Sequence, residues 1–572
     1  MKKQFKLLVL GLLVSGSQYL MAQTARVQVI HNCADAAAAT VDIWVAGSPL
    51  PLIDNFQFRA AAGFIDVAAG VPLTLQVKGP NSVAGDAPIW ETPSPITLTA
   101  NEKYVVIANG IVSATGYSNP QPFGLNIFAL GEESTANTSE VRVNVFHGVT
   151  DAPTVDVEKV PFPTAQVVND LSYGNFTGYV SVPEADLNLQ VRTGDNNTAV
   201  AEYSAPLATL NAGGFGIVVF ASGFLNPAAN SDGAAFGLFA ALPTGTVLPL
   251  PSAAFTPAKV QIIHNSADAA AAVVDIYLND EIAFNNVAFR TATGFVDFPV
   301  AGLGQTSKIS ITGPDAPNSS NPVAEFEVNL VTDRYVVIAN GIASPTGYSP
   351  NPPIALHVQR GALESAASNQ TSILVYHGCT DAPEVDVKVN GTTTTLVDNI
   401  AYGQFQGYVS VPSADVNIDV TLAAGSPIVE TYTAPLSAFP GAVLTVLASG
   451  FLNPSANSNG AGFGLWAAGP AGGALIPLPK ITGIEENTSV EGLNVYPNPA
   501  SSEVFVEFNL AKNEKTTIRL SDLSGKVLSK SELGGVVGNQ RIALNTSDLS
   551  AGLYLVEVIT NNGRTTKKLS IQ

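Results

Sequence analysis

Short apolar runs separated by polar turns recur along the whole chain. Runs rich in β-branched and aromatic residues, such as 104–107, 179–182 and 217–220, are bounded by Gly, Pro, Asn and Asp, which is the pattern of strands and turns. A helical period is hard to find, and the alanine run 36–39 is at most one helical turn because Pro153 lies in the matching segment further along. The pattern predicts an all-β protein.

Two long segments of the chain are near copies of each other. Residues 27–45 (VQVIHNCADAAAATVDIWV) and 260–278 (VQIIHNSADAAAAVVDIYL) agree at 14 of 19 positions and lie 233 residues apart. Residues 145–157 and 375–387 agree at 10 of 13 positions and are a diverged form of the first pair. Such self-similarity predicts four modules in the order A-B-A-B, each of a size that suits a β-sandwich.

Composition and turn signals set the predicted boundaries. Lys2, Lys3 and Lys6 precede a short apolar run that ends in a small residue before Gln23, which is typical of a signal peptide. No other apolar run approaches the length of a membrane span. The predicted segments are a signal peptide at 1–22, module A1 at 23–132, module B1 at 139–251, module A2 at 257–362, module B2 at 369–480, and a C-terminal domain at 490–572.

The charge of the chain limits the classes of partner that it can be expected to bind. The 572 residues carry a formal charge of −20, only 13% of them are charged, and the composition is 46% hydrophobic. Such a chain is too apolar to be disordered. Its acidic surface repels phosphate backbones and anionic lipid, so neither nucleic acid nor a membrane surface is an expected partner.

Every module carries a histidine followed four residues later by an aspartate. These repeat markers are His31 and Asp35, His147 and Asp151, His264 and Asp268, and His377 and Asp381. A metal site needs at least three ligands, and no module has a second repeated histidine or a cysteine pair, so we expect no metal or other cofactor. Calcium is an alternative, because carboxylate and carbonyl oxygens are plentiful, although the sequence has no D-x-D-x-D-G loop. We favour a structural interpretation, in which the histidine bonds the following turn and the aspartate caps it.

A second aspartate recurs further along each module. Asp42, Asp156, Asp275 and Asp386 alternate with apolar neighbours. Because successive side chains of a strand point to opposite faces, we predict that these four face solvent.

The two cysteines occupy equivalent positions. Cys33 and Cys379 each lie two residues after a marker histidine. An exported protein can form disulfides, but these two can join only if the first and fourth modules pack equivalent edges together. Two buried thiols are the preferred interpretation, and the disulfide is the alternative.

Aromatic turns are the candidate binding sites. Tyr117 and Tyr348 lie in TGYS turns of the A modules, and Phe224 with Asn226, and Phe451 with Asn453, lie in FLNP loops of the B modules. Rings beside polar groups can stack on sugars or peptides, but packing beneath a loop is the preferred interpretation, because Phe and Leu in these runs alternate as buried strand residues do. No catalytic residues are predicted, because nucleophile, zinc and phosphate-binding motifs are absent from the sequence.

The C-terminal segment carries a specific combination of motifs. They comprise a YPNP turn, a D-x-x-G-K-V turn, an L-S-x-G-L-Y strand and a terminal basic pair: Tyr496, Pro497, Asn498, Pro499, Asp522, Gly525, Gly552, Leu553, Tyr554, Lys567 and Lys568. In this combination the tail resembles the type A sorting domain of the type IX secretion system of Gram-negative bacteria. The resemblance implies passage through the periplasm and outer membrane, contact with the secretion machinery and its sortase, and removal of the tail as the cargo is attached to surface lipopolysaccharide or released. The alternative is an ordinary small sandwich.

The opening of each B module also has a family likeness. Val145, His147, Asp151, Ala152, Pro153, Val155, Asp156 and Val157, with their counterparts from Val375 to Val387, fit the pattern V-x-H-x-x-x-D-A-P-x-V-D-V. The modules therefore resemble the domain-of-unknown-function family 4397, from which the A modules depart because an alanine run replaces the Ala-Pro step. The resemblance implies extracellular immunoglobulin-like β-sandwiches and supplies no catalytic residues.

These observations predict a secreted, surface-displayed repeat protein with a structural or adhesive, ligand-binding role. Tandem repetition suits avidity or reach better than catalysis. An extracellular glycan hydrolase and a calcium-stiffened surface stalk are the alternatives. An unknown glycan or protein is the expected ligand.

Overall fold

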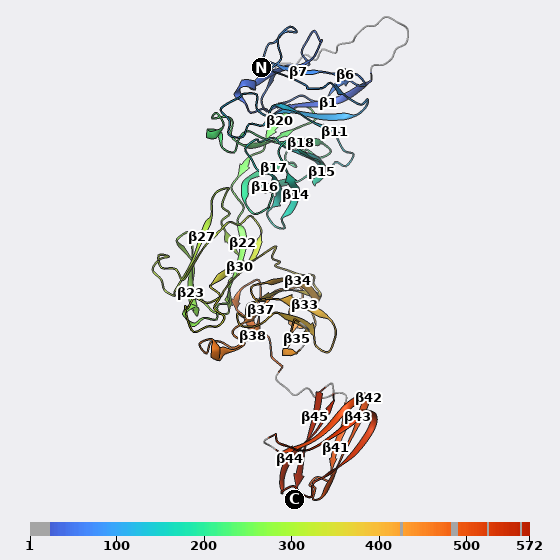
Figure 1. Cartoon of the computed structure of the whole chain (residues 1–572). Coiled ribbons are helices and arrows are strands. Elements are labelled where there is room, and N and C mark those ends of the chain that lie inside the picture. Colours follow the sequence, from blue (N-terminus) through green and yellow to red (C-terminus); the bar gives the residue numbers. More distant parts are fainter. Residues whose placement is uncertain (1–22, 424–426, 482–489, 523–524, 561–562) are drawn as a thin grey trace. The chain divides into compact units, whose positions relative to one another are not determined.

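A computed structural model describes residues 23–423, 427–481, 490–522, 525–560 and 563–572 (Figure 1). Within these ranges the chain consists of strands, turns and loops, with short 3-10 turns as its helical elements, so the prediction of an all-β fold is confirmed. The predicted signal peptide lies outside the described residues. Contacts divide the chain into two compact units. The first holds the chain up to Asp386 with Leu396–Asp415 and Pro435–Leu478, and the second holds Val387–Thr395, Val416–Ala434 and Pro479–Gln572.

The A1 segment forms two main sheets and a small two-stranded one. Their orders are β11-β10-β1-β4, with β5 also paired to β1, then β3-β2-β7-β8, and β6-β9. The elements are β1 (Thr24–His31), η1 (Ala36–Ala38), β2 (Thr40–Val45), β3 (Ile53–Gln57), β4 (Ala60–Ala61), β5 (Ile65–Ala68), β6 (Pro72–Leu73), β7 (Leu75–Lys78), β8 (Trp90–Glu91), β9 (Ile96–Thr97), β10 (Lys103–Asn109) and β11 (Gly124–Ala129).

The B1 segment also forms two sheets. Their orders are β15-β12-β18-β19-β20 and β14-β13-β16-β17-β21. The elements are β12 (Glu140–His147), β13 (Val155–Val160), β14 (Ala165–Leu171), β15 (Phe176–Pro183), β16 (Asp186–Thr193), β17 (Ala199–Pro206), β18 (Gly216–Ser222), η2 (Pro227–Ala229), β19 (Gly237–Ala241), β20 (Val247–Pro249) and β21 (Ser252–Ala253).

The A2 segment repeats the A1 arrangement. Its sheets are β30-β29-β22-β25-β39, with β26 also paired to β22, and β24-β23-β27-β28. The elements are β22 (Ala258–His264), η3 (Ala269–Ala271), β23 (Val273–Leu278), β24 (Glu281–Ala288), β25 (Thr291–Ala292), β26 (Val296–Phe298), β27 (Ser307–Thr312), β28 (Ala324–Val328), β29 (Arg334–Asn340) and β30 (Ala355–Arg360).

The B2 segment contributes the sheet β34-β31-β37-β38-β40 to the first unit. The elements of the segment are β31 (Gln370–His377), β32 (Val385–Val389), β33 (Thr395–Ile400), β34 (Phe405–Pro412), β35 (Val416–Leu422), β36 (Ile428–Ala434), η4 (Leu436–Ala438), β37 (Val443–Ser449), η5 (Pro454–Ala456), β38 (Gly464–Ala468), β39 (Gly473–Ala474) and β40 (Ile476–Pro477).

The C-terminal segment forms one sheet of the order β41-β42-β44-β45, with β43 paired to β42. Its strands are β41 (Val490–Tyr496), β42 (Glu503–Asp522), β43 (Val527–Asn545), β44 (Gly552–Thr560) and β45 (Gly563–Ile571). Alternate residues of β42, among them Val504, Val506 and Phe508, are buried in the core of this domain.

The first strand of every module pairs in parallel with a late strand of the same module. The pairs are β1 with β10, β12 with β18, β22 with β29, and β31 with β37. Each marker histidine is the last residue of such a first strand. The loop that follows therefore begins beside the end of the parallel partner strand.

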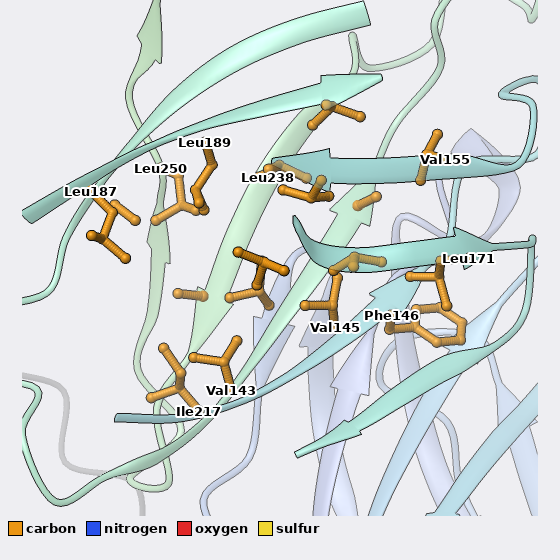
Figure 2. A pocket seen from close by; sticks show the side chains of 18 of the residues that line it. Val143, Val145, Phe146, Val155, Leu171, Leu187, Leu189, Ile217, Leu238 and Leu250 are labelled. Atoms are coloured by element: carbon orange, nitrogen blue, oxygen red, sulfur yellow. The ribbon is translucent and has the colours of Figure 1, made fainter. Parts of the chain in front are cut away.

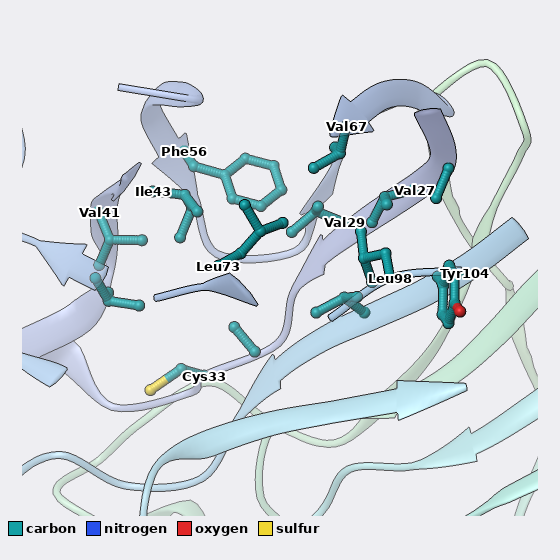
Figure 3. Close-up of a cluster of buried hydrophobic side chains, with 14 of the residues drawn as sticks. Val27, Val29, Cys33, Val41, Ile43, Phe56, Val67, Leu73, Leu98 and Tyr104 are labelled. Atoms are coloured by element: carbon teal, nitrogen blue, oxygen red, sulfur yellow. The ribbon is translucent and has the colours of Figure 1, made fainter. Parts of the chain in front are cut away.

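One face of β1 and β10 builds the core of module A1. Val27 and Val29 belong to one buried cluster with Val41 and Ile43 of β2 (Figure 3). The intervening residues of β10, Val105 and Ile107, are also fully buried. Strands that are buried on both faces read as continuous apolar runs, which explains the stretch YVVIAN.

The other face of these strands packs against module B1. Ile30, Val105 and Ile107 of A1 form a separate buried cluster with Val218 and Phe220 of β18. An equivalent cluster joins A2 to B2 through Ile263, Val336, Ile338, Tyr376 and Leu447. Consecutive A and B modules are therefore joined by a shared apolar core.

Candidate functional site

The loop after each first strand is fastened by its marker histidine. His31 Nε2 donates to Ala38 O at 2.7 Å, and its Nδ1 accepts from the backbone N–H of Cys33 at 3.4 Å. His147 Nε2 repeats the first bond with Pro153 O at 2.9 Å. His264 and His377 do so with Ala271 O and Pro383 O. Burial lowers the pKa of His31 to about 4, despite the opposing bond to Ala38, so the ring is a neutral donor that closes the loop.

The marker aspartates of the A modules hold two loops together. Asp35 accepts from Ala37 N and also from Ser113 N, at 3.0 and 2.6 Å. Tyr117 Oη donates to the same carboxylate at 2.8 Å. Burial raises the pKa of Asp35, but these donors outweigh burial and bring the pKa below its usual value. Asp268 repeats the bonds to Ala270 N and Ser344 N. These carboxylates are therefore occupied by donors of the same module.

The marker aspartates of the B modules fix the FLNP loops. Asp151 accepts from Leu225 N and Asn226 N, each at 2.9 Å, and from Asn230 Nδ2 at 3.0 Å. The oxygen of the Asn230 amide then accepts from Ser118 N of module A1 at 3.0 Å. In the second pair, Asp381, Asn457 and Ser349 make the same chain of bonds. This chain of bonds ties a B-module loop to the TGYS turn of its A module.

The predicted aromatic binding residues lie in this same contact. The ring centroids of Tyr117 and Phe224 are 5.6 Å apart, and those of Tyr348 and Phe451 are also 5.6 Å apart. Phe224 and Phe451 are each only 1% exposed. Neither phenylalanine ring is available to a ligand, because each one packs under its loop against the tyrosine of the neighbouring module. Packing beneath a loop, the interpretation favoured from the sequence, is thus the arrangement that the structure shows for the two phenylalanines.

The two asparagines of the FLNP loops remain on the surface. Asn226 and Asn453 are exposed. Their backbone N–H groups donate to Asp151 and Asp381, and the Asn226 side chain also accepts from Ala229 N at 3.4 Å. Their amide groups thus stay accessible while their backbones are held in place.

Two arginines that the sequence analysis did not single out complete the contact. Arg59 Nε donates to Ser222 Oγ at 3.0 Å, and Nη2 donates to Ala235 O at 2.7 Å. Its guanidinium carbon lies 4.2 Å from the centre of the Phe239 ring. Arg290 repeats the arrangement with Ser449, Gly462 and Trp466. The signal was present in the repeated Phe-Arg steps at 58–59 and 289–290.

We call this set of contacts the A–B joint: the shared apolar cluster, the Tyr-Phe ring pair, the Asp-Asn-Ser chain of bonds and the arginine anchor. Two more hydrogen bonds cross between the modules. Gln28 of β1 donates to Leu242 O, and Asn32, the residue after β1, donates to Ala221 O. Gln261 and Asn265 make the same bonds in the second pair, to Gly469 O and Ala448 O. The joint is thus built twice with equivalent residues.

The prediction that the second aspartates face solvent is wrong. Asp42, Asp156, Asp275 and Asp386 are between 0% and 3% exposed. Each accepts the N–H of a residue with a left-handed backbone on the neighbouring strand: Asn55, Asp170, Asn286 and Asn399 respectively. The strand pairing shifts register beside Asp42, Asp156 and Asp275. Such a shift leaves an N–H group without a strand partner, and the carboxylate supplies the missing acceptor.

Both cysteines are buried free thiols in the structure, and the alternative disulfide is not formed. Cys33 Sγ donates to Gly110 O at 3.0 Å, and Cys379 Sγ donates to Asp381 Oδ1 at 3.2 Å. Burial raises the pKa of each thiol to about 12.

The described residues contain no group of three or more His, Cys, Asp or Glu side chains placed to hold a metal ion. The same residues contain no helix with the length and apolar character that a membrane crossing requires.

The predicted sorting residues lie at the ends of β41 and β42, in the segments that follow them, and on β44 and β45. The Asn498 side chain donates to Lys568 O at 2.8 Å and accepts from Ser570 N at 2.9 Å, which ties the YPNP turn to β45. Asp522 Oδ1 accepts from Lys526 N at 3.0 Å, and Gly525 N donates to Asp522 O at 3.1 Å. Tyr554 Oη donates to Ser550 O at 2.7 Å.

Other residues of the sorting motif remain at the surface. Tyr496 donates to Glu507 at 2.6 Å. Leu553 is 53% exposed, and Lys567 and Lys568 are exposed on β45.

Residues 494–572 match the family described as the secretion system C-terminal sorting domain. The chain ends in a type IX sorting domain. A protein with this sorting domain is exported by the type IX secretion machinery, with which the domain interacts, to the cell surface or the extracellular space. This match therefore confirms the predicted resemblance of the C-terminal segment to a sorting domain and the predicted export of the protein.

The second family match falls on the B modules. Residues 140–227 and 371–458 match the domain of unknown function DUF4397. Both segments include the marker histidine, the marker aspartate and the FLNP loop. The predicted resemblance of the B modules to this family is confirmed at these two places. The family assigns no activity to the modules.

No curated protein sequence matches the chain at a significant level. Similar solved structures include a glycogen-degrading pneumococcal virulence factor, SpuA (10% identity, 54% of this chain and 37% of that chain, TM-score 0.14). Two others are the Bacillus anthracis TIE protein (8%, 83% and 73%, TM-score 0.11) and latent PorU from Porphyromonas gingivalis (10%, 73% and 34%, TM-score 0.13). The chain spans 37% of the pneumococcal protein's length. Similarity at this level does not bear on what this chain does.

Proposed function

We propose that the exported chain is a structural or adhesive protein of the cell surface, and that its working unit is the A–B pair. Its sorting domain delivers it, and attachment to surface lipopolysaccharide after removal of that domain is part of the proposal. The observation that carries the proposal is the A–B joint, which is built twice with equivalent residues at equivalent distances. A protein that bears load or presents a surface needs modules that keep a fixed relation to each other.

The polar groups of the repeated motifs support this role. The marker histidines and aspartates bond to backbone groups of their own loops, and the second aspartates bond to the adjoining strands. A catalytic acid or base must instead reach a substrate. Their use in holding loops together favours a structural or binding protein over a glycan hydrolase.

Contacts between consecutive pairs also support the proposal. Arg192 of B1 is 0% exposed and donates to the backbone oxygen of Thr332 in A2 at 2.6 Å. Gln190 donates to the Thr332 hydroxyl at 2.7 Å. Glu202 of B1 accepts from Thr256 Oγ1 at 2.6 Å. A buried arginine that loses its acceptor is costly, so this contact opposes separation of the two pairs.

Single-molecule stretching of the full chain tests whether the pair is the working unit. If the pair opens as one unit, the unfolding steps lengthen the chain by roughly 80 nm, whereas separate modules give steps of roughly 40 nm. Steps of the shorter length alone would contradict the proposal.

The adhesive part of the proposal needs a binding measurement. The full chain is applied to an array of glycans and extracellular matrix proteins, and the same preparation is assayed for release of sugar from those glycans. Retention on the array without sugar release supports an adhesive role. Sugar release would favour the hydrolase.

A further inference from the structure

Arg59 and Arg290 hold a backbone conformation that arginine rarely adopts. Their φ angles are 62° and 63°, in the left-handed region that favours glycine. The equivalent residues of the B modules are Gly174 and Gly403, because the backbone N–H of all four residues donates to the oxygen of a marker histidine at 2.8 or 2.9 Å. The A modules therefore keep a long cationic side chain where this fold accepts glycine. Residues held in such a conformation cluster at functional sites.

Each of these guanidinium groups has one nitrogen that no protein group uses. Through Nε and Nη2, Arg59 donates to Ser222 and Ala235, and Arg290 donates to the equivalent residues of the second joint. Nη1 of each arginine makes no hydrogen bond within the described part of the chain, and neither Nη1 atom is buried. Two N–H groups per arginine are thus free to bind an acceptor from solution.

Among the described residues, neither arginine has a carboxylate partner. Burial lowers the pKa of Arg59 and lowers the pKa of Arg290 to about 10, and no carboxylate opposes either shift. Both side chains are still cations at neutral pH, so each joint carries a positive charge that the chain does not neutralise. The other arginines of the modules each form an ion pair with an acidic side chain: Arg26, Arg142, Arg192, Arg334 and Arg360.

An aromatic ring lies against each of the two guanidinium groups. The guanidinium carbon is 4.2 Å from the ring centre of Phe239 in the first joint and 4.2 Å from that of Trp466 in the second. Both rings are half-buried, so part of each is open to solvent. An aromatic ring offers an apolar surface to the C–H groups of a sugar, whereas an acidic amino acid has little apolar surface to place there. The surroundings therefore favour an acidic sugar over an acidic peptide.

The interior of module B1 offers no alternative site for a charged ligand. Its cavity has a volume of about 80 Å³ and is lined mostly by apolar side chains, such as Val143, Leu189 and Leu238 (Figure 2). A charged group is costly to bury without a partner. A charged ligand therefore needs polar groups that solvent reaches, as it does at Arg59.

We propose that Nη1 of Arg59 and Nη1 of Arg290 each bind the carboxylate of an acidic sugar, so that each A–B joint holds one such group. The free N–H groups of Nη1 donate to the carboxylate, and the sugar ring lies against Phe239 or Trp466. The net charge of −20 disfavours a polyanion, so the expected ligand carries isolated carboxylates. The two sites rest on the adhesive role proposed above and specify its ligand.

An NMR titration of the full chain, labelled with ¹⁵N at arginine Nε, follows each site directly. The variants Arg59→Gly and Arg290→Gly identify the two signals, because glycine occupies the same backbone position in the B modules. Sodium galacturonate, added at constant ionic strength, should shift both signals saturably. We expect galactose to bind about tenfold more weakly, because it cannot form the charge-assisted hydrogen bond. We expect acetate to bind about fivefold more weakly, because it has no sugar ring to lie against the aromatic side chain.

Arg142 supplies the control signal within the same sample. Its Nε and Nη2 donate to Glu132, each at 2.9 Å, so its signal should not shift. In Arg59→Gly, the Arg290 signal should respond to galacturonate with an unchanged dissociation constant, because the two sites lie in separate joints. Circular dichroism establishes that each variant is folded, and Arg59→Lys and Arg290→Lys identify the signals if the glycine variants do not fold.

The proposal is overturned if galacturonate does not shift the Arg59 and Arg290 signals saturably, or if it shifts the Arg142 signal equally. It is also overturned if galactose or acetate binds as tightly as galacturonate. Retention of the chain on the glycan array without these shifts would reject the two arginine sites and leave the adhesive role in place.

Discussion

The ring of Tyr117 in module A1 packs against the ring of Phe224 in module B1, with 5.6 Å between their centroids. The tyrosine hydroxyl donates to Asp35 of its own module, and the loop of Phe224 is fixed by Asp151 of the other. Two loops that each module stabilises separately thus meet through a ring contact. Tyr348 and Phe451 repeat this relationship 231 and 227 residues further along.

Phe224→Ala should loosen the first A–B joint. Phe224 is 1% exposed, and removal of a buried phenylalanine ring costs about 3–5 kcal/mol. We expect hydrogen-exchange protection of β18 to fall by about 100-fold or more, measured by mass spectrometry, since about 1.4 kcal/mol corresponds to a tenfold change. Phe215→Ala, at a residue that is 38% exposed, is the control and should have little effect. Equal loss of protection in both variants would contradict the role of the ring.

Asp42→Ala should destabilise the sheet β3-β2-β7-β8 of module A1. The buried carboxylate of Asp42 accepts from Asn55 N at 2.7 Å and from Ser82 N at 2.6 Å, and without it both donors lose a charged acceptor. The expected cost is about 2–3 kcal/mol. Faster hydrogen exchange at β3 is the measurement. Asp54→Ala, at an exposed position of the same strand, should leave the exchange unchanged. An effect of similar size at both positions would show that loss of the hydrogen bonds to Asp42 is not the cause.

The strands and the duplication could be predicted from sequence because both depend on local patterns. The parallel strand 104–107 is a β-branched run, and the identities at 27–45 and 260–278 need no structure to be seen. The shared core of a pair could not be predicted in the same way. Val105 and Val106 look equivalent in sequence, yet Val106 faces its own module and Val105 faces the next one.

Burial of Asp42 and the role of Arg59 escaped prediction for a related reason. A strand aspartate between apolar residues normally faces solvent, whereas the irregular backbone at Asn55 on a neighbouring strand turns an N–H group toward Asp42. Arg59 is anchored by Ser222 and Ala235, more than 160 residues away in the chain. Such partners are brought together by tertiary packing, which no local pattern encodes.

The thiols of Cys33 and Cys379 should be unreactive in the folded chain. Both are 0% exposed, and burial raises the pKa of each to about 12. Because the thiolate is the reactive form, we expect no reaction with an aromatic disulfide reagent under native conditions and two thiols per chain in denaturant. The count in denaturant should not change after prior reduction. A count of zero in denaturant that rises to two after reduction would instead indicate a disulfide.

The stability of module A1 should fall as the pH drops below about 6.5. Burial lowers the pKa of His31 from 6.5 to about 4, so the folded state holds the neutral ring while the unfolded state binds a proton. The stabilisation is complete above pH 6.5 and is lost progressively toward pH 4. For one histidine this amounts to about 2–3 kcal/mol between pH 7 and pH 4.5. Burial also lowers the pKa values of His147, His264, His357 and His377, which act in the same direction in their own segments.

The contribution of His31 can be isolated with His31→Gln, because the glutamine amide can donate to Ala38 O but does not titrate. Hydrogen-exchange protection of β1 is measured at pH 7 and pH 4.5 in both proteins, after correction for the intrinsic pH dependence of exchange. We expect the unsubstituted chain to lose about 30-fold more protection than the variant, which is the fold-change that 2 kcal/mol represents. The carboxylates are the same in both proteins, so their contribution to the pH dependence cancels in this comparison. An equal loss in the two proteins would show that protonation of His31 does not oppose folding.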